Sequence, residues 1–259
     1  MPLRRHGGIS LAVKALAPTL IIAAMWELYA RLSRVPDYIL PAPSEVWLSF
    51  TQHYEALAAH ALVTLQESLA GLLLGVMIGS VTATVLYSSR SLRTALMPLL
   101  IMFNSFPKIA IAPVLILWLG TGVSSKVVLS ALLVFFPITV NVLAGLMRVD
   151  PELLELFRSW RATSWTIFRM IRIPTAFPHF VDGVKVAIPL AVIGALIGEF
   201  IGASKGLGYL LLLAGSSLDV SLQFAALITM GLISLIPFYL LRHVQSRIAR
   251  RWSWGGAEG

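Results

Sequence analysis

Residues 68–89 read SLAGLLLGVMIGSVTATVLYSS, a stretch of 22 residues without a single Asp, Glu, Lys or Arg. An α-helix needs roughly 20 apolar residues to cross the hydrocarbon core of a bilayer, and this stretch has that length. Residues 127–147 and 220–241 are equally free of these four residue types. The three windows therefore predict three transmembrane helices.

The overall composition points to the same class of protein. Of the 259 residues, 58% are hydrophobic and 12% are charged, and the mean hydropathy is +0.84. Soluble domains are about half apolar and about a quarter charged, so this chain has too little polar surface for a soluble globule. The same composition excludes a disordered chain, which would need low hydrophobicity and high charge.

Three weaker apolar windows include charged residues: residues 15–32 with Glu27, residues 94–119 with Lys108, and residues 186–201 with Glu199. One soluble core could not bury six such segments. We predict an all-α integral membrane protein with a single domain over residues 1–259. The six transmembrane helices are expected at about 13–32, 64–88, 94–118, 126–147, 181–202 and 221–241.

The first span could be mistaken for a signal peptide, because Arg4 and Arg5 precede an apolar run. Lys14 interrupts that run, however, and no convincing small-residue cleavage site comes before Glu27. We therefore expect an uncleaved first span.

Lys and Arg residues near the span ends predict the orientation, because cytoplasmic loops carry an excess of them. One set of ends holds Arg4, Arg5, Lys14, Arg90, Arg93, Arg148, Arg158, Arg161, Arg169, Arg172, Arg242, Arg247, Arg250 and Arg251. The opposite set holds Arg31, Arg34, Lys126 and Lys205. This bias predicts cytoplasmic termini and explains the net charge of +8 without nucleic-acid binding.

Two spans carry small residues at helical spacing. Gly71, Gly75 and Gly79 lie four apart in the second span, and the fifth span repeats the pattern from Gly194 to Gly202. Residues four apart share one face, where small side chains let two backbones approach closely in lipid. These faces pack either within the chain or against a second copy.

The third span is irregular, because Asn104-Ser105-Phe106-Pro107-Lys108 lies inside it. Proline removes a backbone donor, and broken helices often mark a substrate path. Lys108 and Glu199 are ionisable residues inside predicted spans, which is a functional hypothesis by default. Each could instead be structural, as a snorkelling residue or a member of an ion pair. Glu27 and Glu67 lie nearer to span ends and are expected at the interface.

Residues 35–49 are interrupted by prolines, so they are not expected to span the membrane. Ser44 could cap a short helix that contains Trp47 and Phe50. Such an amphipathic segment would lie at the outer interface.

One long cytoplasmic segment, residues 148–180, lies between the fourth and fifth spans. Asp150 and Pro151 are typical of a helix start, and Leu153, Phe157 and Trp160 recur at helical spacing. A second short helix can start near Thr163 and end at Pro174 and Pro178. The pair could lie on lipid headgroups or dock a cytoplasmic protein.

Several motifs together resemble one family. Asp150-Pro151-Glu152-Leu153-Leu154-Glu155-Leu156-Phe157, then Arg161-Ala162-Thr163 and Ile173-Pro174, resemble the EAA loop of ABC importer permeases. Further motifs resemble the nitrate/sulfonate/taurine branch: Phe106-Pro107-Lys108, Trp118-Leu119-Gly120-Thr121-Gly122, Phe135-Phe136-Pro137, Gly198-Glu199-Phe200 and Gly206-Leu207-Gly208. The likeness covers residues 16–248.

This resemblance implies a type I ABC importer permease in a bacterial inner membrane. It implies a homodimer around a shared path, a cytoplasmic ATPase dimer that binds ATP and Mg²⁺, and an extracytoplasmic solute-binding protein. The residues expected to couple to the ATPase are Leu153, Glu155, Phe157, Trp160, Arg161, Ala162 and Thr163. Those expected along the path are Asn104, Ser105, Lys108, Phe135, Phe136 and Glu199.

The loop departs from the family pattern at one turn, where Arg161 stands in place of a glycine. Arginine disfavours a left-handed backbone, so we expect the turn geometry or the fit to the ATPase groove to differ.

No catalytic constellation accompanies these motifs. The chain has no G-x-x-x-x-G-K-[ST] phosphate loop, no cysteine and no metal-ligand spacing among its five histidines. We predict a transport subunit that is not an enzyme and holds no cofactor. The expected substrate is an organic or inorganic anion such as a sulfonate, taurine or nitrate. Alternatives are a pyrimidine or other vitamin precursor, and an autonomous secondary transporter.

Overall fold

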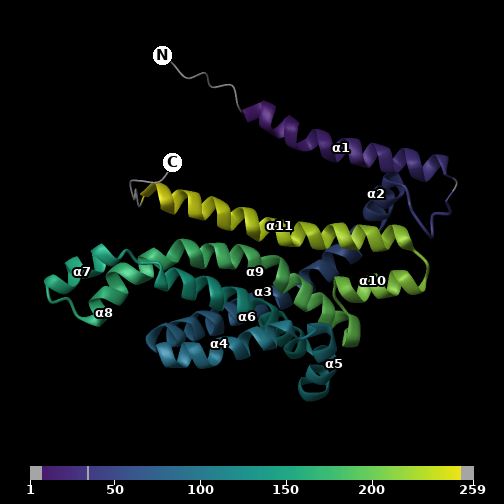
Figure 1. The fold of residues 1–259 in the computed structure, drawn as a ribbon. Coiled ribbons are helices and arrows are strands. Elements are labelled where there is room, and N and C mark those ends of the chain that lie inside the picture. The colour runs from purple at the N-terminus through teal and green to yellow at the C-terminus, as the bar shows by residue number, and fades with distance from the viewer. Residues whose placement is uncertain (1–7, 34, 252–259) are drawn as a thin grey trace, which may run out of the picture.

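The computed structural model describes residues 8–33 and 35–251, and every regular element in those ranges is helical. The elements are α1 (Gly8–Leu32), α2 (Pro43–Gln52), α3 (Tyr54–Ser88), α4 (Arg90–Ser105), α5 (Lys108–Leu119), α6 (Val123–Met147), α7 (Pro151–Ser159), α8 (Ser164–Ile167), a π-helix η1 (Phe168–Arg172), α9 (Ile173–Gly202), α10 (Leu207–Ser216) and α11 (Val220–Arg251). Figure 1 shows the long helices lying roughly side by side along the length of the molecule.

Four helical segments are long and apolar enough to cross a membrane: Tyr54–Ser88, Val123–Met147, Ser164–Gly202 and Val220–His243. The pair α4 and α5 passes the same test together, with a bend of 91° between its halves. These five account for the predicted spans from the second to the sixth, and the broken third span matches its prolines. The predicted first span forms helix α1, and its crossing of the membrane stays a prediction.

The core is built by α6, which packs between α3 and α9. Gly71, Gly75 and Gly79 of α3 contact Ser130, Val134 and Ile138 of α6, with the same separation along the chain in all three pairs. On its other side, α6 meets α9 in the opposite direction, where Gly194 contacts Ser130 and Gly198 contacts Lys126. Helix α6 therefore runs parallel to α3 and antiparallel to α9.

The glycine faces thus pack within the chain, one of the two alternatives that the sequence left open. A Cβ built on Gly71 would lie 2.3 Å from Ser130 Cβ, and one on Gly194 would lie 2.4 Å from Ser130 Cα. Because no side chain larger than hydrogen fits at either distance, the glycines set how closely these helices approach. The Ser130 hydroxyl donates to the Ala191 carbonyl at 2.9 Å and ties α6 to α9.

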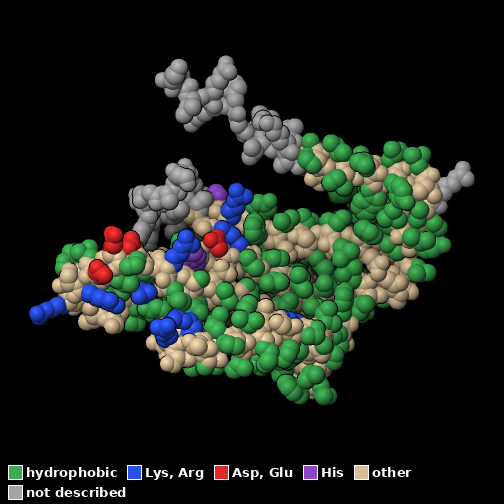
Figure 2. Space-filling view, viewed as in Figure 1, with side chains coloured by type: hydrophobic (Ala, Val, Ile, Leu, Met, Phe, Trp, Pro, Cys, Tyr) green, Lys and Arg blue, Asp and Glu red, His purple; other side chains and the backbone are tan. Residues whose placement is uncertain are grey.

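The two ends of the molecule differ in chemistry. The start of α1, the end of α11, and α7 with α8 lie towards one end, whereas α2 and α10 lie towards the other. Figure 2 shows the Lys and Arg side chains of the visible face gathered towards the α7 end, with hydrophobic side chains covering the rest. The loop between the fourth and fifth spans thus lies towards the same end of the molecule as the end of α11, and the orientation in the membrane stays a prediction.

The loop between α6 and α9 is shorter than predicted. Pro174 and Pro178 were expected to end a short helix, but both lie inside α9, and the helical segment runs from Ser164 to Gly202 without a break. The π-helix explains the difference: the Ile173 N–H reaches back five residues to the Phe168 carbonyl. This wider turn gives the ring of Pro174 room one residue later. The predicted loop 148–180 is therefore already helical from Ser164 onwards.

Helix α2 forms where expected, but its cap differs from the prediction. Ala42 is the N-cap residue, and Ser44 lies inside the first turn. The Glu27 carboxylate of α1 accepts from the Ser44 backbone N–H at 3.0 Å and from its hydroxyl at 2.8 Å. Glu27 thus stabilises the start of α2 and joins α1 to it.

Candidate functional site

The loop that follows α6 begins with a capped helix, as predicted. Asp150 Oδ1 accepts a hydrogen bond of 2.9 Å from the Glu152 N–H, and Pro151 occupies the first helical position of α7. Thr163 caps α8 in the same way, because its Oγ1 accepts from the Thr166 N–H at 3.2 Å. Both short helices therefore start where the sequence placed them.

Between the two helices, Arg161 takes the left-handed backbone conformation, with φ of 57°. The Arg161 N–H donates to the Arg158 carbonyl at 2.9 Å, and the Ala162 N–H donates to the Phe157 carbonyl at 3.0 Å. This pair of bonds is the Schellman ending of a helix, in which glycine is the usual residue at the Arg161 position. Arginine therefore does not alter the turn geometry, because the turn keeps the left-handed form at a cost of roughly 1–2 kcal/mol. An altered fit to the ATPase groove stays a prediction.

The loop presents aromatic and apolar side chains to its surroundings. The side chains of Trp160 and Trp165 are 69% and 66% exposed, and Leu156 is also exposed. Leu153 and Phe157, which were predicted on the exposed face, are half-buried instead. The Phe157 ring lies 5.7 Å from the Trp160 ring, and the two ring planes are tilted by 46°. Large apolar side chains exposed together commonly mark an interaction surface.

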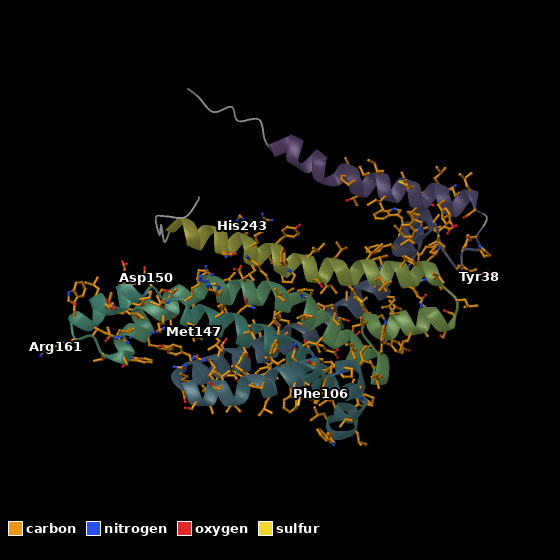
Figure 3. All side chains as sticks on the ribbon, in the orientation of Figure 1. Tyr38, Phe106, Met147, Asp150, Arg161 and His243 are labelled. Atoms are coloured by element: carbon orange, nitrogen blue, oxygen red, sulfur yellow. The ribbon has the colours of Figure 1, made fainter. Side chains whose placement is uncertain are left out.

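The remaining predicted coupling residues share this surface. Glu155 and Thr163 are exposed, and Ala162 is half-buried. Figure 3 labels Asp150 and Arg161 at the end of the molecule that carries α7. The structure thus gathers the predicted coupling residues on one small projection, which we call the α7–α8 loop (residues 150–167).

A chain of contacts joins the α7–α8 loop to the spans. The Trp165 ring stacks on Phe168 at 5.8 Å, and Phe168 stacks on Tyr87 of α3 at 5.9 Å. The Arg172 guanidinium lies 4.7 Å from the centre of the Tyr87 ring, and its Nη1 donates to the Leu146 carbonyl of α6 at 2.7 Å. A displacement of the loop would therefore act directly on α3, α6 and α9.

The residues expected along the path fall into separate places. Lys108 lies at the bend between α4 and α5, where its Nζ donates to the Asn104 carbonyl oxygen and, at 3.2 Å, to Asn104 Oδ1. Ser105 lies beside them and donates to the Ile101 carbonyl at 3.0 Å. Phe135 and Phe136 are half-buried on α6. No contact within the described residues joins Lys108 to Glu199, so these two ionisable side chains do not form an ion pair with each other.

Glu199 belongs to a buried charged cluster with Glu67 and Lys126. The three side chains are 1%, 3% and 5% exposed, so water scarcely reaches them. Lys126 Nζ donates to the carbonyls of Thr121 and Gly122 at 2.6 and 3.0 Å. The carboxyl groups of Glu67 and Glu199 lie within hydrogen-bonding range of each other, and Lys126 interacts with both. Glu67 Oε2 has no hydrogen-bond partner among the described residues.

Sequence reasoning missed this cluster. Glu67 was expected at the interface and Lys126 at the outer span ends, but both face inward. Their positions explain why: Glu67 precedes Gly71 by four residues, and Lys126 precedes Ser130 by four. Each residue therefore continues the face on which Gly71 meets Ser130. Glu67 and Lys126 each lie four residues before a member of the Gly71–Ser130 contact, and this equal spacing is the sequence signal that could have predicted their proximity.

The same region holds the start of α10. The N–H groups of Gly206, Leu207 and Gly208 donate to His60 Nδ1 at 2.9 Å, to Thr64 Oγ1 at 2.8 Å and to Glu199 Oε2 at 2.5 Å. The first amides of a helix lack partners inside it, so side chains of α3 and α9 supply them here. Gly206 has φ of 107°, and a Cβ on it would lie 2.3 Å from Glu199 Cδ. The two glycine motifs around Glu199 and Leu207 therefore meet in space.

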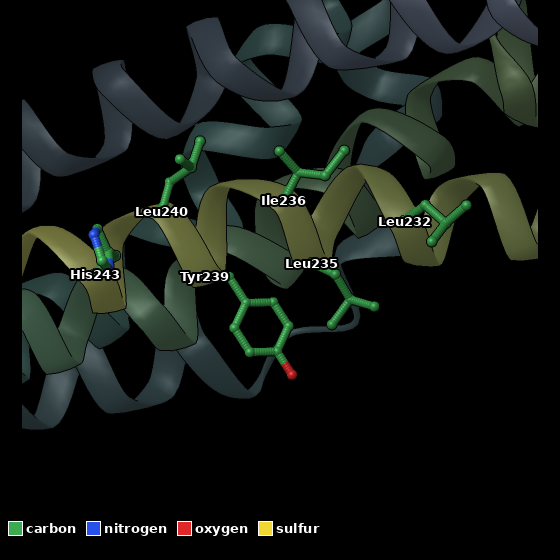
Figure 4. A pocket seen from close by; sticks show the side chains of 6 residues that line it. All are labelled: Leu232, Leu235, Ile236, Tyr239, Leu240 and His243. Atoms are coloured by element: carbon green, nitrogen blue, oxygen red, sulfur yellow. The ribbon is translucent and has the colours of Figure 1, made fainter. Parts of the chain in front are cut away.

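A shallow groove of about 400 Å³ runs along α11. Its lining comes from α11 alone and consists of Leu232, Leu235, Ile236, Tyr239, Leu240 and His243. Figure 4 shows these side chains along the surface of the helix. A groove lined by a single helix cannot surround a solute, so we do not assign it as a substrate site.

Among the described residues, no group of three or more His, Cys, Asp or Glu side chains could hold a metal ion. The buried cluster contributes two carboxylates, and its third charged member is the ammonium group of Lys126.

The fold resembles that of solved transporters. The chain matches a chain of the MetNI methionine ABC transporter in an inward-facing conformation, with a TM-score of 0.65 and 22% sequence identity. The match covers 77% of this chain and 97% of that chain. It shows the helical arrangement of a type I importer permease.

Sequence comparisons agree with the fold. A "Probable ABC transporter permease protein" of Haemophilus influenzae is 37% identical over 88% of this chain and 94% of its own length. The formylaminopyrimidine transport permease protein ThiX of Halalkalibacterium halodurans is 34% identical, over 90% of this chain and 94% of its own. The putative aliphatic sulfonates transport permease protein SsuC of Bacillus subtilis is 26% identical, over 92% and 87%.

The model of the family described as "binding-protein-dependent transport system inner membrane component" matches residues 71–251. That range holds α6, α9, the α7–α8 loop and the glycine face of α3, together with Lys126 and Glu199 of the buried cluster. The chain therefore belongs to this family, the permeases of ABC importers.

Proposed function

We propose that this chain forms the translocation path of an importer for a small solute, by alternating access driven by a separate ATPase. Two copies of the chain surround the path. An ATPase dimer, which itself binds ATP and Mg²⁺, docks at the α7–α8 loops. A solute-binding protein delivers substrate at the end of the molecule that carries α2 and α10. Both termini and the α7–α8 loop face the cytoplasm. The fourteen-to-four bias of Lys and Arg supports that orientation.

The observation that carries the proposal is the α7–α8 loop itself. It presents exposed Trp160 and Trp165 at the end of the molecule where basic residues gather. Contacts through Phe168 and Arg172 join it to α3 and α6. In an importer whose permease has no phosphate loop, a partner must supply the energy. The exposed tryptophans of the α7–α8 loop can bind that partner, and the contacts to α3 and α6 can transmit its movement to the membrane-spanning helices.

For the substrate, the relatives support a pyrimidine or other vitamin precursor as the first candidate. The permease named for formylaminopyrimidine is 34% identical to this chain, and the permease named for aliphatic sulfonates is 26% identical. A sulfonate, taurine or nitrate is the second candidate. Lys108, the cation at the bend between α4 and α5, is the observation that favours an anion, although Asn104 already accepts from its ammonium group.

Uptake in proteoliposomes that contain the permease, its ATPase and its solute-binding protein tests the proposal. We expect uptake to require ATP inside the compartment that holds the ATPase, and to persist when a protonophore dissipates the proton gradient. An autonomous secondary transporter would show the opposite pattern: uptake without the ATPase, and loss of uptake with the protonophore. Competition between a labelled aminopyrimidine and taurine for the solute-binding protein separates the two substrate candidates.

A further inference from the structure

Arg161 occupies its turn against the preference of its own backbone. Its φ of 57° lies in the left-handed region, at the helix-ending position where glycine is favoured. A glycine would adopt the same conformation without strain. Backbone strain of this kind often accompanies a function of the side chain, because glycine would form the same turn at lower energy.

Nothing in the part of the chain that the structure describes uses the Arg161 side chain. It is exposed, and its guanidinium makes no hydrogen bond or ion pair with any described residue. Stabilisation of the helix dipole does not require it, because Arg158 already places a cation in the last turn of α7. Glu152 and Glu155 lie towards the start of α7, and Arg158 and Arg161 lie at its end. The tip of the α7–α8 loop therefore carries positive charge, and no carboxylate of the described residues forms an ion pair with Arg161.

The place of Arg161 in the molecule points to a protein rather than to lipid. Figure 3 shows Arg161 at the extreme end of the molecule, beyond Met147, where α6 ends. A headgroup layer would lie beside the span ends, whereas Arg161 projects past them. Its neighbour Trp160 is 69% exposed and would anchor in an apolar pocket of the same partner.

We propose that Arg161 pairs with a carboxylate on the rim of the ATPase groove, and that this pair helps the permease select its cognate ATPase. The inference rests on the proposed docking at the α7–α8 loop and adds the charge that the partner must carry. A guanidinium binds a carboxylate through two parallel hydrogen bonds, so it specifies geometry as well as charge. ATPases of related importers that lack this carboxylate would bind less well.

The test uses the full-length permease in nanodiscs and its purified cognate ATPase. Three variants separate strain from charge: Arg161→Gly relieves the strain and removes the cation, Arg161→Lys keeps a cation, and Arg161→Glu reverses the charge. Arg90→Glu is the control, because Arg90 is exposed at the start of α4 and is not part of the α7–α8 loop. Trp160→Asp tests the docking itself.

We expect Arg161→Gly to weaken ATPase binding about tenfold, and Arg161→Glu to weaken it further. The thermal stability of the permease should not fall in Arg161→Gly, because glycine suits the turn. Arg161→Lys should lose only a few-fold in affinity, and Arg90→Glu should match the wild type. The affinity of the wild type should fall with salt more steeply than that of Arg161→Gly. Reversing the partner carboxylate of the ATPase to arginine should restore binding of Arg161→Glu.

Distinct outcomes overturn distinct claims. If Trp160→Asp releases the ATPase while Arg161→Gly and Arg161→Glu bind it like the wild type, the docking stands and the proposed ion pair is wrong. If Trp160→Asp also binds normally, the docking itself fails. If Arg161→Glu alters hydrogen exchange of residues 151–163 only in nanodiscs with anionic lipid, and leaves ATPase binding intact, Arg161 serves lipid headgroups and the inference is overturned.

Discussion

Thr64 donates a hydrogen bond of 2.6 Å to Glu199 Oε1, and this buried contact joins α3 to α9 across 135 positions of sequence. The same Thr64 hydroxyl accepts from the Leu207 N–H at 2.8 Å, so one residue bridges α3, α9 and the start of α10. With Lys126 of α6 close by, four helices meet in one polar cluster inside an apolar core. We interpret this cluster as the contact that holds α3, α6, α9 and α10 in a fixed arrangement.

Removing Glu199 should destabilise the permease strongly. Glu199→Ala removes the carboxylate that accepts from the Thr64 hydroxyl and from the Gly208 N–H. A buried donor left without an acceptor costs about 1–3 kcal/mol. Thermal unfolding in detergent checks this, with Glu55→Ala as the control because Glu55 is exposed at the start of α3. Equal melting temperatures for the two variants would show that the cluster contributes nothing to stability.

The glycine contacts predict position-specific sensitivity to a single methyl group. Gly194→Ala would place a Cβ 2.4 Å from Ser130 Cα, so α6 and α9 must separate. Overpacking of this kind costs about 1–3 kcal/mol. Gly231→Ala is the matched control, because a Cβ there meets no atom within 4 Å, and alanine favours a helix. The melting temperatures of the two variants test this prediction, and Gly194→Ala should melt below Gly231→Ala. Equal melting temperatures would contradict the close packing of α6 against α9.

The orientation can be measured directly, because the chain has no cysteine. Ser159→Cys places a single thiol at the exposed end of α7. We expect an impermeant maleimide to label it in inverted membrane vesicles and not in intact cells. Labelling from outside intact cells would reverse the proposed topology.

Lys108 distinguishes the two substrate candidates. If an anion passes the bend between α4 and α5, Lys108→Met should reduce uptake by about tenfold or more, because a charge-assisted contact is lost. ATPase binding and basal ATP hydrolysis should persist, since Lys108 lies outside the α7–α8 loop. Unchanged uptake would assign Lys108 the structural role of holding Asn104 at the bend, and would favour a pyrimidine or other vitamin precursor as the substrate.

Local signals in the sequence predicted local structure well. Asp150, Pro151 and Thr163 start short helices as expected, because caps act within a few residues. The glycine spacing predicted close helix contacts, but its partner face on α6 carries Ser130, Val134 and Ile138, which have no small-residue pattern. The contact partner could therefore be found only from the fold.

Long-range features escaped the sequence for a physical reason. Glu67 and Lys126 look interfacial because each lies near the end of an apolar run, yet the packing of α6 against α3 and α9 buries both. Pro174 and Pro178 look like helix ends, but both lie inside α9, and the π-helix before it makes room for Pro174. At Arg161 the Schellman hydrogen bonds prevail over the preference of the residue.

The central claim is that the α7–α8 loop docks an ATPase that drives transport. The most direct test is co-purification and ATP-dependent uptake with the double variant Leu156→Asp, Trp160→Asp, which replaces two exposed apolar side chains of α7 and its C-cap. Each buried apolar side chain is worth about 1.5–3 kcal/mol in such an interface. We predict that the variant inserts and unfolds like the wild type but neither retains the ATPase nor imports substrate. A variant that retains its ATPase and transports normally would contradict the account.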